Sequence, residues 1–125
     1  MATGILSKAE TKEPNMTREA IIRFQVMVYC HLHSIPVTAS DVECLTAIGL
    51  KGKSRLSTIC TDMVQKGVFS SSQSIRNSLD KLQDKGLIEK EQLSGKSKAV
   101  YLSDSMKIAT EGSILVDIKC LYKEQ

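Results

Sequence analysis

The sequence predicts an α+β fold, mainly helical, in which four helices precede a β-hairpin. Apolar residues recur with helical spacing through residues 17–85, and capping residues and glycines separate the segments. After Gly86, two apolar runs flank a Ser-Gly-Lys-Ser turn at 94–97. The 125 residues, 42% of them hydrophobic, suffice for one domain with its own core. Because only 4% of residues are aromatic, we expect that core to be aliphatic.

The first helix is expected over residues 17–33. Asn15 or Thr17 can accept a hydrogen bond from the free N–H groups at its start. Apolar side chains occupy most of its circumference, which predicts burial on more than one side. Pro36 prevents continuation of the helix. The polar residues 1–15 are expected to form an N-terminal tail.

Two shorter helices follow. Ser40 and Glu43 have the spacing of a capping box, so the second helix is expected to begin at Ser40. Gly49 is a natural stop for it, and residues 50–54 then form a loop. The third helix is expected to extend to about Lys66, because its apolar residues recur at i, i+3, i+4, i+7 and i+8.

The fourth helix is expected over residues 72–85, and any of the serines at 70–72 can cap it. Gly86 ends this helix. Leu87 and Ile88 then begin a strand, and residues 99–102 form the strand that returns.

The C-terminal extension, residues 103–125, is expected to pack on the same domain as residues 16–102. Its apolar residues mostly alternate with polar ones, and a Glu-Gly-Ser sequence at 111–113 is typical of a turn. These features favour a second β-hairpin. A short helix from Ser113 is the alternative, because the apolar residues after it also fit a helical period.

This order of elements resembles the winged helix-turn-helix superfamily of DNA-binding proteins. The similarity covers roughly residues 16–102 and includes the short joint at 63–69 and the helix-to-strand passage at 85–90. The additional N-terminal helix makes the pattern similar to MarR-like transcription regulators. The resemblance implies that the fourth helix is a recognition helix and that the hairpin is a wing. MarR-like regulators usually end in long dimerisation helices, and residues 103–125 depart from that pattern.

The outward face of the fourth helix carries side chains suited to DNA. Opposite the inward-pointing Ile75, amide side chains can pair with adenine edges, an arginine with guanine, and serines with phosphates. The expected DNA-binding residues of this helix are Ser72, Gln73, Ser74, Arg76, Asn77 and Lys81. Asp80 and Asp84 share this face and count against DNA contact, because carboxylates repel phosphates.

Six further cations are candidates for phosphate contacts. They lie on the predicted hairpin and in the segment before the third helix: Lys90, Lys96, Lys98, Lys51, Lys53 and Arg55. Hairpin lysines can equally serve to keep a strand edge soluble, and the cations before the third helix can belong to a plain solvated loop.

The predicted function is sequence-specific binding of double-stranded DNA, as a small transcription regulator. The net charge of +3 is compatible with this function and does not by itself indicate it. The alternative is a structural or assembly protein, for example a component of a viral particle or of DNA packaging. Such a protein would use the winged helix to contact partner subunits. The broadly apolar first helix is compatible with a homodimer.

No catalytic, cofactor or metal site is expected. Gly52, Lys53 and Ser54 lack the upstream glycine spacing of a phosphate-binding loop. His31 and His33 point in different directions on a helix, so a metal site near Cys30 is not expected. The four cysteines lie in apolar stretches, which favours a reducing, cytoplasmic location, or a virion under the alternative. No apolar run is long enough to span a bilayer, and no membrane partner is expected.

Overall fold

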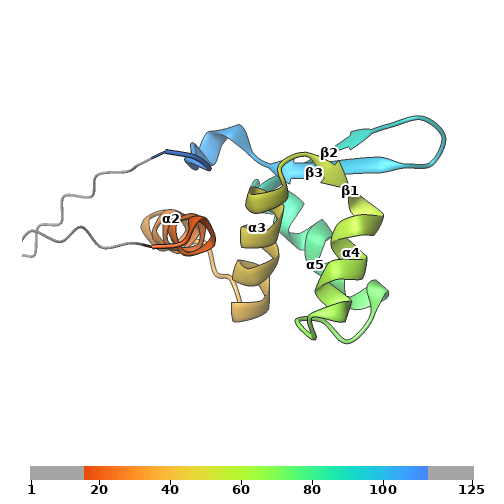
Figure 1. The fold of residues 1–125 in the computed structure, drawn as a ribbon, viewed down its shortest axis with the longest axis horizontal. Coiled ribbons are helices and arrows are strands. Elements are labelled where there is room, and N and C mark those ends of the chain that lie inside the picture. Colours follow the sequence, from red (N-terminus) through yellow and green to blue (C-terminus); the bar gives the residue numbers. More distant parts are fainter. Residues whose placement is uncertain (1–15, 113–125) are drawn as a thin grey trace, which may run out of the picture.

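The computed structural model describes residues 16–112, an α+β structure that is mainly helical (Figure 1). The expected tail at 1–15 and the end of the C-terminal extension, 113–125, lie outside the described residues. The four α-helices of the described part are α2 (Arg18–Leu32), α3 (Ala39–Lys51), α4 (Leu56–Gln65) and α5 (Ser72–Asp84). The strands are β1 (Ser54–Arg55), β2 (Ile88–Gln92) and β3 (Lys98–Leu102), and a 3-10 helix, η1, covers Asp104–Met106.

The caps of α2 and α5 follow the local sequence. The Thr17 hydroxyl, one of the two predicted caps, accepts a hydrogen bond from the Ala20 N–H at 3.0 Å. Ser71 caps α5 in a reciprocal capping box with Ser74. Each cap satisfies backbone donors that a helix start otherwise leaves unpaired, and each is expected to contribute about 1 kcal/mol.

The predicted capping residue of α3, Ser40, is wrong by two residues, and the helix begins at Ala39. Its capping box joins Thr38 and Asp41, with hydrogen bonds of 3.1 Å and 3.0 Å between each side chain and the other residue's N–H. Ser40 lies inside the helix, where its hydroxyl donates to the Val68 carbonyl at 3.4 Å. Glu43 is engaged with Arg23 on α2, so it cannot reach back to cap the helix. Thr38 offers the same capping chemistry two residues earlier.

The prediction that Gly49 ends α3 is also wrong. The helix continues to Lys51, and Gly52, with a φ of 73°, is its C-cap. Gly49 instead lies buried where α2, α3 and β3 meet. A Cβ atom there would lie 2.9 Å from Cγ2 of Ile22 and 3.0 Å from Cδ1 of Leu102. Close packing, rather than helix termination, explains this glycine.

The three strands form an antiparallel sheet in the order β1-β3-β2. The predicted hairpin is confirmed, with Lys90 opposite Val100 in its register. Strand β1 was not predicted, because two residues are too short to show an alternating pattern. It pairs Ser54 with Val100. The predicted loop at 50–54 is therefore wrong, since it contains the end of α3 and the start of β1.

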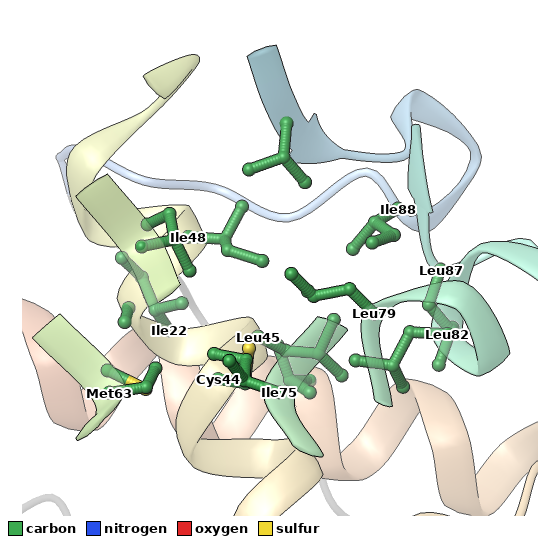
Figure 2. Packing of buried hydrophobic residues seen from close by; sticks show 14 of the residues in the cluster. Ile22, Cys44, Leu45, Ile48, Met63, Ile75, Leu79, Leu82, Leu87 and Ile88 are labelled. Atoms are coloured by element: carbon green, nitrogen blue, oxygen red, sulfur yellow. The ribbon is translucent and has the colours of Figure 1, made fainter. Parts of the chain in front are cut away.

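The core is aliphatic, as expected, and lies between the helices and the inner face of the sheet (Figure 2). The predicted stripe of α5, Ile75, Leu79 and Leu82, is fully buried in it. Burying each of these side chains stabilises the fold by about 1.5–3 kcal/mol. The stripe therefore fixes which side of α5 faces solvent.

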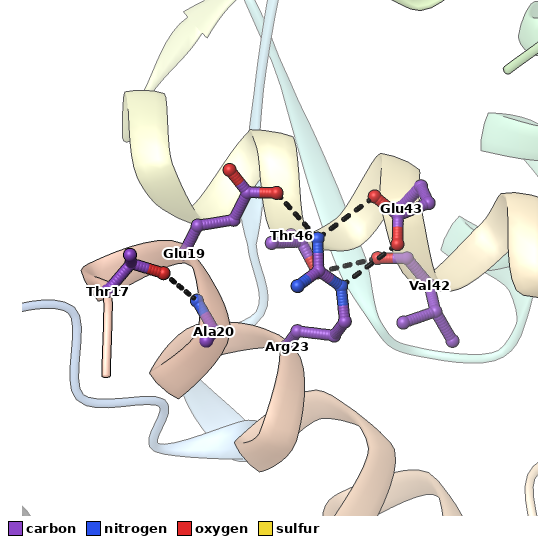
Figure 3. A network of polar contacts seen from close by, with 7 residues as sticks. All are labelled: Thr17, Glu19, Ala20, Arg23, Val42, Glu43 and Thr46. Carbon is purple, nitrogen blue, oxygen red and sulfur yellow. Dashed lines mark hydrogen bonds and ion pairs between the residues drawn. The ribbon is translucent and has the colours of Figure 1, made fainter. Parts of the chain in front are cut away.

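A polar network links α2 to α3 (Figure 3). The Arg23 guanidinium donates to both carboxylate oxygens of Glu43, at 2.9 Å and 3.1 Å. It also donates to Glu19, one turn earlier on α2, at 2.5 Å. The hydrogen bonds with Glu43 and then Glu19 raise the pKa of Arg23. The network fixes α2 against α3 at one edge of the apolar contact.

The predicted second hairpin does not begin within residues 103–112. Met106 enters the core from η1, and the following residues lie along α2 without forming a strand. The side chain of Gln25, rather than another strand, pairs with the backbone of Ala109. Its amide oxygen accepts from the Ala109 N–H at 2.8 Å, and its amide nitrogen donates to the Ala109 carbonyl at 2.7 Å. Arg18 donates to the Thr110 carbonyl at 2.5 Å. The alternative helix from Ser113 lies outside the described residues.

Candidate nucleic-acid interface

Helix α5 is held beside the β2–β3 hairpin by a tight joint. The Leu87 N–H donates to the Leu82 carbonyl at 3.0 Å, and Gly86 adopts a φ of 78° in the turn between helix and strand. A positive φ suits glycine, because other residues are strained there. Leu87 is fully buried. The start of β2 is therefore fixed relative to the solvent-exposed face of α5.

Three segments that are distant in sequence meet at one place on the surface: residues 55–57, α5 and the hairpin turn. They enclose an open hollow of about 230 Å3, lined by Arg55, Leu56, Ser57, Arg76, Lys96, Ser97 and Lys98. We call the four basic residues of this lining, Arg55, Arg76, Lys96 and Lys98, the cationic hollow. Arg55 ends β1 and is the N-cap of α4, Arg76 comes from α5, and the two lysines come from the hairpin.

The charges of the cationic hollow are uncompensated. Within residues 16–112, none of its four basic side chains forms an ion pair, and all four residues are exposed. Arg55 is the N-cap of α4 but makes no side-chain cap hydrogen bond. The first N–H groups of α4 add partial positive charge at the same place. The hollow therefore concentrates positive potential and suits an anion.

The other three predicted phosphate ligands are engaged in ion pairs. Each lysine ammonium lies close to a carboxylate oxygen of another element. The pairs are Lys51 with Asp62 at 2.6 Å, Lys53 with Glu91 at 2.6 Å, and Lys90 with Asp80 at 2.5 Å. Lys53 also lies 5.5 Å from the centre of the Tyr101 ring. Of the six predicted cations, three lysines are thus paired with carboxylates and three residues belong to the cationic hollow. Arg76 is the fourth member of the hollow.

The pairing of Asp80 changes the electrostatics expected for α5. Lys90 extends along the inner face of the sheet, with its side chain only 12% exposed, and reaches the Asp80 carboxylate. The hydrogen bond from Lys90 lowers the pKa of Asp80, and Lys98 contributes in the same direction. Of the two carboxylates that counted against DNA contact, Asp80 is therefore balanced by a cation, whereas Asp84 is exposed and forms no ion pair within residues 16–112. The ion pair of Asp80 also holds the hairpin to the helix.

The remaining predicted residues of α5 divide by their contacts. Gln73 donates to the side-chain oxygen of Asn77 at 2.9 Å, so these two exposed amides form one polar unit. The Ser74 hydroxyl donates to the Ser71 carbonyl at 2.9 Å and belongs to the cap. Ser72 is exposed in the first turn. Lys81 is exposed but lies about 140° around the helix from Arg76, on the flank away from the hollow.

The predictions from the sequence missed two polar residues of the hollow, Ser57 and Ser97. Ser57, in the first turn of α4, lines it, and the N–H groups of that turn lie beside it. For Ser57, the signal present in the sequence was the Arg-Leu-Ser segment just before the apolar stripe of the third helix. Nothing in the sequence shows that this helix start meets the hairpin turn, because that contact depends on the tertiary fold.

The cysteines of the described part are buried thiols. Cys30, Cys44 and Cys60 form no disulfide, and burial raises the pKa of all three, that of Cys44 to about 12. No three His, Cys, Asp or Glu side chains between residues 16 and 112 are arranged to hold a metal ion. Among the helices of the same residues, none is long and apolar enough to cross a bilayer.

Comparison of the chain with protein-family models, curated proteins and solved structures gives no match. The candidate interface therefore rests on its own geometry: a cationic hollow, a polar helix face beside it, and a hairpin fixed against both.

Proposed function

We propose that the chain is a winged helix-turn-helix protein that binds double-stranded DNA, as a small transcription regulator. The observation that carries the proposal is the cationic hollow between α5 and the hairpin turn. The order of elements, with a short strand between α3 and α4 and a sheet order of β1-β3-β2, supports the winged-helix assignment.

In this proposal α5 enters the major groove and the hairpin lies along the adjacent backbone. Arg76 then lies between the major groove and the adjacent backbone, because it lines the hollow and directly precedes Asn77 on α5. The amide unit of Gln73 and Asn77 retains donors and an acceptor for a base edge, and an adenine edge presents one of each. Lys96 and Lys98 then neutralise phosphates beside the groove.

The salt dependence of binding tests the proposal. Fluorescence anisotropy with a labelled duplex is measured from 50 to 200 mM salt. Three phosphate contacts, from Arg55, Lys96 and Lys98, predict a log–log slope of about −2.7, which is roughly a 40-fold loss of affinity over that range. Selection from a random duplex pool should enrich one motif. Absence of duplex binding at low salt, or a flat response to salt, would contradict DNA binding, and selection without enrichment would contradict sequence specificity.

A further inference from the structure

The solvent-exposed face of α5 carries two amide side chains that are joined to each other. Gln73 lies in the first turn of the helix and Asn77 one turn later, and both are exposed. The Gln73 amide nitrogen donates a hydrogen bond to the Asn77 side-chain oxygen at 2.9 Å. Residues four apart are neighbours on a helix surface, so regular helix geometry allows this contact. The two amides therefore form one connected polar surface rather than two independent side chains.

The hydrogen bond fixes the orientation of the Asn77 amide. An unpaired asparagine can rotate its amide by half a turn, which exchanges the positions of its donor and its acceptor. Because its oxygen is held by Gln73, the Asn77 amide has a defined side on which its nitrogen donates. Within residues 16–112, the Asn77 nitrogen donates to no other group and the Gln73 oxygen accepts from none. The pair therefore offers a donor from Asn77 and an acceptor from Gln73.

The nearest polar neighbours on α5 are already engaged. The Ser74 hydroxyl donates to the Ser71 carbonyl within the helix cap. The Asp80 carboxylate lies three residues after Asn77, a spacing at which an asparagine amide can donate to it. It accepts a hydrogen bond from the Lys90 ammonium instead. The free amide atoms are therefore available to a ligand that presents an acceptor beside a donor.

We propose that Gln73 orients the Asn77 amide and that the two side chains together read a single adenine in the major groove. This inference rests on the proposed function, because it requires α5 to lie in that groove. Adenine presents there an acceptor, N7, beside a donor, the N6 amino group. Asn77 donates to N7, and the Gln73 oxygen accepts from N6. Guanine presents two acceptors at the same edge, which would leave the Gln73 oxygen facing another acceptor.

An adenine analogue tests this reading with the full chain and the duplex motif that selection enriches. 7-Deazaadenine replaces N7 by a C–H group and retains Watson–Crick pairing. It is placed at each adenine of the motif in turn, and binding is measured by fluorescence anisotropy. At one position it should weaken binding of the parent protein by about 2- to 13-fold, the contribution of one hydrogen bond. A motif without adenine, or tolerance of the analogue at every position, would overturn the proposal.

A charged variant of Gln73 tests its effect on the orientation of Asn77. The carboxylate of Gln73→Glu should accept from the Asn77 nitrogen, so that the Asn77 oxygen turns to the base and no donor faces N7. The loss caused by 7-deazaadenine should then disappear. This loss is a ratio of two affinities of the same variant, so the added charge cancels. Gln83→Glu is the matched control, because Gln83 is an exposed glutamine in the last turn of the same helix and should retain the loss. Equal sensitivity to the analogue in the two variants would overturn the role of Gln73.

A double-mutant cycle tests whether the two amides act as one unit. Gln73→Ala and Asn77→Ala should each weaken binding to the motif. The double variant should lose less than the product of the two single losses, because either change disrupts the shared contact with adenine. Circular dichroism verifies that all variants are folded. Single losses that multiply in the double variant would overturn the coupling.

These assays distinguish the adenine reading from the proposed function. A parent protein that binds no duplex at low salt would contradict DNA binding, and the adenine reading would be overturned with it. A parent protein that binds its selected motif but tolerates 7-deazaadenine everywhere would retain the proposed function and lose only the adenine reading.

Discussion

Asp80 restrains Lys90, and releasing that lysine should strengthen binding to DNA. The Lys90 ammonium lies 2.5 Å from the Asp80 carboxylate, on the side of α5 that faces the hairpin. Asp80→Asn removes the negative charge and retains the shape of the side chain. The pair is largely exposed on the Asp80 side, so its loss should lower the free energy of unfolding by at most about 1 kcal/mol.

The expected gain in affinity for DNA is larger than this loss of stability. If released Lys90 contacts one phosphate, the log–log salt slope steepens by about 0.9, and affinity at 0.1 M salt rises roughly eightfold. Anisotropy with the same duplex measures both quantities. Glu89→Gln is the control, because Glu89 is exposed on β2 opposite Tyr101 and forms no ion pair within the described residues. An Asp80→Asn variant that binds no more tightly than Glu89→Gln would refute the reasoning.

Three further predictions concern specificity, packing and the thiols. Arg76→Ala and Asn77→Ala should each cost about 1–3 kcal/mol on the selected duplex and less on random duplexes, measured by anisotropy. Gly49→Ala should gain about 1 kcal/mol of helix propensity but lose about 1–3 kcal/mol to overpacking against Ile22, so urea unfolding should show net destabilisation. A stabilised variant would show that the contact relaxes freely. The Cys44 thiol, whose pKa is raised to about 12, should resist alkylation at pH 8 until the chain is unfolded, as followed by peptide mass spectrometry; rapid labelling of the folded protein would contradict its burial.

The ion pair between Asp80 and Lys90, which joins α5 to the hairpin, should stabilise the fold at neutral pH and cease to do so in acid. Lys90 lowers the pKa of Asp80 below its ordinary value of about 3.9. The contact therefore contributes fully above that value and is lost as the pH falls through the lowered pKa. Asp80 should therefore remain ionised at pH 5 to 8, the range in which duplex binding is measured.

The helices were predictable from the sequence because their signals are local. Thr17, one of the two predicted caps, caps α2, and the stripe of Ile75, Leu79 and Leu82 defines the inward side of α5. The errors occur where two local signals compete. Thr38 and Ser40 both offer a capping hydroxyl, and the local sequence does not show that Glu43 is drawn to Arg23.

The candidate site was predictable only as a set of residues. Helix period and turn chemistry placed Arg76 and the hairpin lysines on the exposed surface. They could not show that Lys51, Lys53 and Lys90 find carboxylates 11, 38 and 10 residues away in sequence. Nor could they bring Arg55 to the hairpin turn, because its position depends on a two-residue strand that pairs with β3. These contacts are set by the tertiary fold.

The central claim is that the cationic hollow, rather than positive charge in general, binds the DNA backbone. It is tested most directly by comparing two double variants that each lose two charges: Lys96→Gln with Lys98→Gln, and Lys51→Gln with Lys53→Gln. The first should reduce the magnitude of the log–log salt slope for duplex binding by about 1.8. The second should leave the slope near that of the parent, because its lysines are held by Asp62 and Glu91. Equal changes in the two variants would contradict the claim.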